Sequence, residues 1–224
     1  MSVEQTTTTN RRPNYLFAVA PLLWAVLILF HPMPGGDSTL DGIDDVVDRW
    51  LIVHVGQLIL TPLLFLSVWR LLDGLTTKAA TTSRCGLVVW TVFFSAYDAV
   101  QGLAAGLLVR HADDVTPAQH DAIAEALDYL VLESRLAGDI SAIQMVAGAA
   151  WLTVAIGAAI ALHQARAGTA IVALTAISVV FSMHMAPAAI GLVALTAAVA
   201  IRERQRASTT TAPSTTAVLS TPLG

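Results

Sequence analysis

Apolar residues in this chain come in long blocks separated by short polar stretches, and each block is long enough for a membrane-spanning helix. Four blocks cover about 15–31, 50–72, 85–109 and 140–162, and a fifth covers 167–201. A helix rises ~1.5 Å per residue, so about 20 apolar residues cross a hydrocarbon core of ~30 Å. The pattern therefore predicts an all-α protein that forms a bundle of transmembrane helices.

The last apolar block is too long for a single crossing. It contains no Asp, Glu, Lys or Arg over 35 residues, and as one helix it would measure ~52 Å. Ala186-Pro187 interrupts it, because proline lacks a helical donor and disfavours the α conformation of the residue before it. We therefore expect two short helices, about 168–183 and 187–201, joined by a turn at His184. This hairpin brings the number of membrane segments to six.

The polar stretches form tails and loops. Residues 1–14 and 202–224 are polar and rich in Thr, and we expect them to be disordered tails. In the longest loop, the stretch Thr116-Pro117-Ala118-Gln119 combines a capping residue, a proline at the first helical position and a Gln three residues after the cap. Apolar residues then recur at helical spacing opposite acidic ones. This predicts an amphipathic helix over about 117–136 that lies over the bundle or in the membrane interface.

Basic residues favour one orientation of this bundle. With six segments, nine lysines and arginines share the side of both chain ends and three lie opposite, whereas a single crossing by 167–201 divides them six to six. Basic residues gather on the cytoplasmic side of membrane proteins. We therefore expect a protein of the cell membrane with both termini in the cytoplasm.

Composition narrows the functional classes. Hydrophobic residues make up 55% of the 224 residues, and the basic residues are too few and too dispersed for a nucleic-acid surface. The single cysteine, Cys85, excludes an internal disulfide and a multi-thiolate metal site. The nucleophile-elbow, P-loop and dinucleotide-binding motifs are missing, so an enzyme is the less favoured class.

Polar residues inside or at the ends of the predicted segments are the candidates for function. They are Asp98, His54, Gln57, Gln101, Gln144 and His184, all expected between the midplane and the outer surface of the membrane. Counting the helical rise from the predicted helix ends places His54 ~6 Å and Asp98 ~16 Å below the outer surface. A carboxylate inside the membrane is costly and often marks a proton or ion path. Asp98 is therefore the leading candidate for a proton or cation site.

Two glycines share a helical face with Asp98. Gly102 and Gly106 are spaced so that a neighbouring helix can approach closely, which predicts that Asp98 faces protein rather than lipid. A purely structural role remains the alternative for this residue. In that case a protonated Asp98 is hydrogen-bonded to a neighbour such as Gln57 or Gln101 and only holds two helices together.

The histidines raise the question of a cofactor. His54 and His184 are expected at similar depth, as axial haem ligands would be, and His31, His54 and His184 are weak candidates for holding a divalent metal. No HxxxH or HExxH spacing supports a metal site, and only one histidine lies within a span. We predict no cofactor and keep a haem- or metal-binding membrane protein as the third interpretation.

These observations favour one function and one rival. The favoured function is a multi-pass membrane protein with an outward-facing polar cavity, which transports or senses a small polar solute, a proton or a cation. The rival is a non-catalytic accessory or structural subunit that binds a partner membrane protein through its spans. Both functions are compatible with a homo-oligomer, and in both the protein has the lipid bilayer as a partner.

Overall fold

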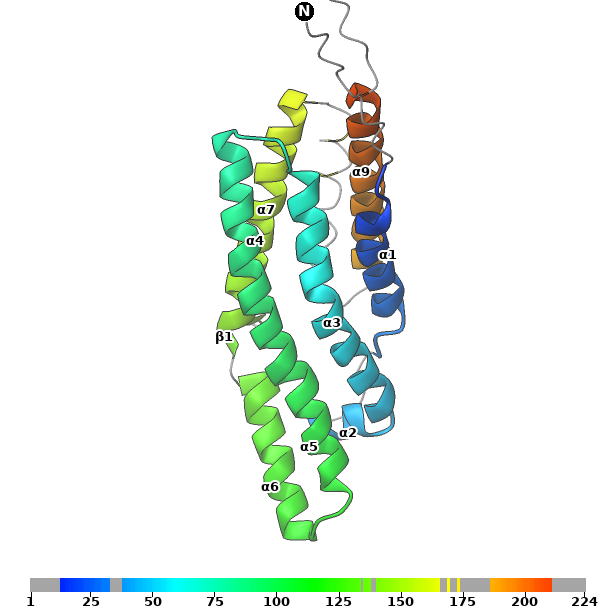
Figure 1. The fold of residues 1–224 in the computed structure, drawn as a ribbon. Coiled ribbons are helices and arrows are strands. Elements are labelled where there is room, and N and C mark those ends of the chain that lie inside the picture. Colours follow the sequence, from blue (N-terminus) through cyan, green and yellow to red (C-terminus); the bar gives the residue numbers. More distant parts are fainter. Residues whose placement is uncertain are drawn as a thin grey trace, which may run out of the picture.

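The computed structural model describes residues 13–32, 38–133, 135–137, 140–165, 169, 173 and 186–210, and these residues form a largely helical protein (Figure 1). The expected turn at His184 lies outside them, as does nearly all of the expected helix 168–183. Among the described residues, three helices are long and apolar enough to cross a membrane, namely Val47–Leu71, Lys78–Ala112 and Ala142–His163. The structure thus supports a membrane helical protein in general terms.

The elements follow one another with short connections. The helices are α1 (Leu16–Leu29), α2 (Thr39–Asp44), α3 (Val47–Leu71), α4 (Lys78–Tyr97), α5 (Ala105–Ala112), α6 (Pro117–Asp128), α7 (Ala142–Ala165) and α9 (Ala186–Thr210). Two π-helical segments, η1 (Asp98–Ala104) and η2 (Tyr129–Glu133), continue α4 and α6. The short strands β1 (Arg135–Ala137) and β2 (Ile140–Ser141) pair antiparallel before α7.

The long helices lie side by side (Figure 1). α4 packs antiparallel against α7, where the Ser83 hydroxyl donates a 2.6 Å hydrogen bond to the carbonyl of Val154. A Cβ atom on Gly157 would lie 2.8 Å from the carbonyl oxygen of Ala79, so this seam needs a glycine. α1 packs against α3 and α9. The core of the bundle includes buried aromatic rings from α1, α4 and α7. Measured between ring centroids, Trp24 lies 5.3 Å from Phe94 and Trp90 lies 4.7 Å from Trp151.

Several helix ends differ from the expected ones. α4 begins at Lys78 rather than near 85, because the Thr77 side chain caps it by accepting a 3.2 Å hydrogen bond from the N–H of Ala80. α9 continues to Thr210, so residues 202–210 are helical where a tail was expected. α1 has 14 residues and measures ~21 Å, which is less than the thickness of the hydrocarbon core.

The amphipathic loop helix is present as α6, and it is docked. The Gln119 side chain accepts a 3.1 Å hydrogen bond from the N–H of Thr116, as the capping sequence predicts. Leu127 is completely buried and belongs to a small core with residues of α2, α3 and α5. The N–H of Thr39 donates a 3.0 Å hydrogen bond to Asp128, which ties α6 to the start of α2. The α-helix ends at Asp128, earlier than the expected 136, and passes into η2.

Candidate functional site

A buried histidine–aspartate pair joins α3 to the π-helical segment η1. Nδ1 of His54 lies 2.6 Å from Oδ1 of Asp98, and the two residues expose only 2% and 0% of their surface. The sequence identified both residues but assigned Asp98 other hydrogen-bond partners. The structure places this carboxyl group against protein, as the glycine pattern predicted, with an ionisable ring as its partner.

The depth estimate for this pair was wrong. It placed the two residues at different levels, because it counted each from the expected end of its own helix. In the structure they lie at one level, since α5 and α6 project beyond the start of α3 at this end of the bundle (Figure 1). Helix ends that project unequally cannot serve as a common membrane surface.

Two glycines, Gly102 in η1 and Gly106 in α5, allow α3 to come close enough for this contact. A Cβ atom on Gly102 would overlap Nδ1 of His54, and one on Gly106 would lie 2.7 Å from a Leu51 methyl group. The Trp50 indole N–H donates a 2.7 Å hydrogen bond to the carbonyl oxygen of Gly102. Any side chain at 102 would therefore displace the His54 ring and disrupt the pair.

The π-helical geometry of η1 helps to align these groups. In a regular α-helix, positions eight residues apart differ by ~80° around the axis. The wider π turn over Asp98–Ala104 reduces this drift, so that Asp98, Gly102 and Gly106 all face α3. π-Helical segments are rare and occur often at functional sites.

Aromatic rings cover the pair on the side of the α1–α2 connection. The rings of Trp50 and His31 lie 4.6 Å and 5.2 Å from the ring of His54, measured between centroids. His31 follows the end of α1, and its Nδ1–H donates to the carbonyl of Pro32 at 2.8 Å.

Two polar groups on the residues of this site are buried without a hydrogen-bond partner among the described residues. They are Oδ2 of Asp98 and the side-chain amide of Gln57, which lies one helical turn from His54 and is completely buried. A buried amide that makes no hydrogen bond costs free energy, typically ~1–3 kcal/mol. These atoms are therefore available to a proton, a cation or a polar solute that enters the site.

The other sequence candidates lie elsewhere. Gln101 donates a 3.4 Å hydrogen bond to the carbonyl of Leu130 in η2, and Gln144 is a partly exposed residue of α7. The structure does not describe His184. Of the weak metal candidates, His31 and His54 are close neighbours. Within the described part of the chain, no group of three His, Cys, Asp or Glu side chains is arranged to hold a metal ion.

Sequence reasoning missed a second buried ionic group, at the opposite end of α3. Glu203 of α9 is 2% exposed and accepts hydrogen bonds from Arg70 at 2.8 Å, from Arg206 at 2.6 Å and from the N–H of Asn14 at 3.2 Å. Burial raises the pKa of this carboxyl, but the hydrogen bonds outweigh it and hold the pKa below its usual value. The sequence pattern did not predict this group, because residues 202–224 are polar and were expected to form a disordered tail.

The chain matches no family model, no curated protein and no solved structure.

Proposed function

We propose that this chain is a proton-responsive membrane protein in which His54 and Asp98 form the proton-binding site. The observation that carries the proposal is the 2.6 Å hydrogen bond between two ionisable side chains that are both enclosed by protein. Ionisable groups inside a membrane protein are costly, and they recur in proton and ion pathways. The protein transports or senses a small polar solute, a proton or a cation through changes at this pair.

The number of protons on the pair determines which of its atoms donate and accept hydrogen bonds. With the pair carrying a single shared proton, Nδ1–H of His54 donates to Oδ1 of Asp98. A second proton on the carboxyl group removes its negative charge and leaves one donor and one acceptor oxygen, so the hydrogen bond from His54 is no longer charge-assisted and the contact between α3 and η1 weakens. Separation of these helices would expose Oδ2 of Asp98 and the amide of Gln57 to an incoming solute. The site is enclosed in the described conformation, so its outward-facing polar cavity belongs to a second, opened conformation.

Carboxyl vibrations provide a direct test that needs no known substrate. Difference infrared spectra of the purified protein are recorded across the pH range in which imidazole titrates. We expect a protonated-carboxyl band that changes together with imidazole bands in the wild type, and that is lost in Asp98→Asn. The band should persist with a shifted midpoint in His54→Gln. A wild-type spectrum without any titrating carboxyl band over this range would overturn the proposal.

We also propose the finer topology, with six membrane segments, both termini in the cytoplasm and a cell-membrane location. Two observations support it. The distribution of basic residues favours an even number of crossings. In addition, Asn14 before α1 and Arg70 near the end of α3 both donate hydrogen bonds to Glu203 of α9, so these three segments meet at one end of the bundle.

The accessory-subunit function remains the second candidate, because enclosure also suits a purely structural pair. Asn can replace a protonated carboxyl as a donor and acceptor. If His54 and Asp98 only hold α3 against η1, Asp98→Asn should keep both the fold and the cellular phenotype of the wild type. Loss of the phenotype in a folded Asp98→Asn protein favours proton binding.

A further inference from the structure

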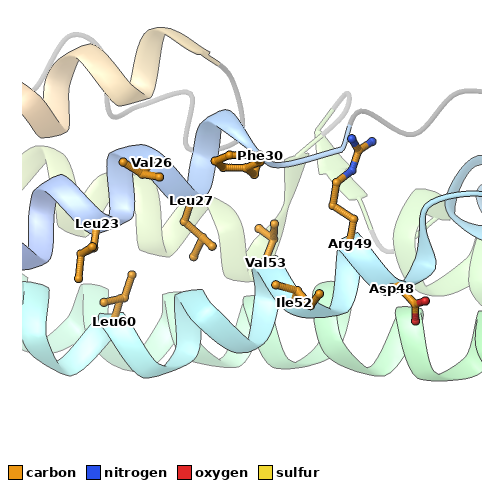
Figure 2. A pocket seen from close by; sticks show the side chains of 9 residues that line it. All are labelled: Leu23, Val26, Leu27, Phe30, Asp48, Arg49, Ile52, Val53 and Leu60. Atoms are coloured by element: carbon orange, nitrogen blue, oxygen red, sulfur yellow. The ribbon is translucent and has the colours of Figure 1, made fainter.

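An apolar groove runs along the surface between α1 and α3 (Figure 2). Its volume is about 680 Å³. The walls consist of side chains from the last half of α1 and the first half of α3, namely Leu23, Val26, Leu27, Phe30, Ile52, Val53 and Leu60, and Asp48 and Arg49 line one end. Several of these side chains are open to the surroundings, with Ile52 68% and Phe30 63% exposed.

The length of the groove matches one leaflet of a bilayer. From Arg49 to Leu60 the α3 backbone advances ~16 Å, about half of a ~30 Å hydrocarbon core. The charged end lies at the beginning of α3, where an apolar span leaves the membrane. A groove of this length suits an extended hydrocarbon chain whose polar end lies beside Arg49.

Two oppositely charged residues, Asp48 and Arg49, lie at the charged end of the groove. Asp48 and Arg49 leave α3 on opposite sides (Figure 2), and Asp48 forms an ion pair with Arg110 of α5. Arg49 is exposed and has no carboxylate within ion-pairing distance among the described residues. Asp48 is thus already paired with Arg110, and Arg49 is the group at this end of the groove that suits an anion. Arg is well suited to phosphate, which it binds with two parallel hydrogen bonds.

We propose that this groove binds one acyl chain of an anionic phospholipid, whose phosphate lies against Arg49. The apolar walls hold the chain, and the guanidinium group selects the negative headgroup over a zwitterionic one. The proposal depends on the membrane location of the protein and is independent of proton binding at His54 and Asp98.

Native mass spectrometry of the full chain tests this proposal. The protein is reconstituted in nanodiscs that contain equal amounts of phosphatidylglycerol and phosphatidylcholine, and the lipids that remain bound after release are counted. One basic residue near a membrane surface favours an anionic lipid by about fivefold. We expect one retained lipid with about this preference for phosphatidylglycerol, and an even ratio in Arg49→Gln.

Two variants separate the headgroup from the chain. Arg204→Gln removes an exposed arginine near the opposite end of α3 and should keep the wild-type preference. Ile52→Trp adds bulk to an exposed position of the groove and should lower retention of both lipids. Equal retention of the two lipids by the wild type, or an unchanged preference in Arg49→Gln, would overturn the proposal. So would a crosslinked dimer through a cysteine at position 52, because a second copy would then cover the groove.

Discussion

Glu203 connects three segments that are far apart in the sequence, and its charge should make the protein sensitive to acid. The pKa of this carboxyl is lowered in the folded state from a usual value of 4.5. Its stabilising contribution is therefore complete above the unfolded pKa and is lost as the pH falls through the folded pKa. Glu203→Gln leaves Arg70 and Arg206 without their buried partner, and we expect a loss of about 3 kcal/mol near neutral pH.

Thermal unfolding in detergent over a range of pH measures this effect. The difference between wild type and Glu203→Gln should shrink below about pH 4.5 and vanish once the wild-type carboxyl is protonated. Asp73→Asn is the matched control, because Asp73 also pairs with Arg70 but its side chain is 53% exposed. An exposed pair contributes little. A pH-independent difference between wild type and Glu203→Gln would show that the ion pairs are not its cause.

The sequence identified both His54 and Asp98 as candidate residues but did not predict the contact between them. Asp98 is conspicuous because a carboxylate in an apolar span is rare, and the spacing of Gly102 and Gly106 correctly predicted a close helix on its face. The partner could not be predicted, because it depends on how far α5 extends past the start of α3. That offset is a property of packing between helices and leaves no local pattern in either one.

Among the elements, α6 offers the clearest test of docking. Leu127 is completely buried in the small core with α2, α3 and α5. Truncation of a buried leucine leaves a cavity, so Leu127→Ala should lower the free energy of unfolding by about 3 kcal/mol. Asp121→Ala, on the exposed face of the same helix, should change it by less than ~0.5 kcal/mol. Equal effects of the two variants in thermal unfolding would mean that α6 is not held against the bundle.

Long apolar helices could be predicted from the sequence, whereas their capped ends could not. The blocks at 50–72, 85–109 and 140–162 correspond to the three helices that are long enough to span a membrane. The polar first turns of α4 were missed, because hydropathy begins at Cys85 while the Thr77 cap lies well before it. The short helix α2 begins with a similar cap, in which the Ser38 hydroxyl accepts from the N–H of Asp41. Local hydrogen bonds of this kind set helix ends independently of membrane length.

For the whole molecule, the arrangement of the ends can be tested by labelling single cysteines on a Cys85→Ala background. Cysteines at 78 and 204 should react only from the cytoplasmic side, because their segments meet at one end of the bundle. Cysteines at 41 and 114 should react from outside. External labelling at 204 would contradict six segments and leave an odd number of crossings.

The π-helical segment η1 has a consequence for the molecule as a whole. Each residue added to or removed from an α-helix turns everything beyond it by ~100°. α4, before η1, packs mainly against α7, whereas α5, after it, packs against α2, α3 and α6. One wide turn thus sets the angular offset between two interfaces along a single rod. A change in the length of this turn would therefore rotate α5 relative to α4 and change which of its side chains face α3.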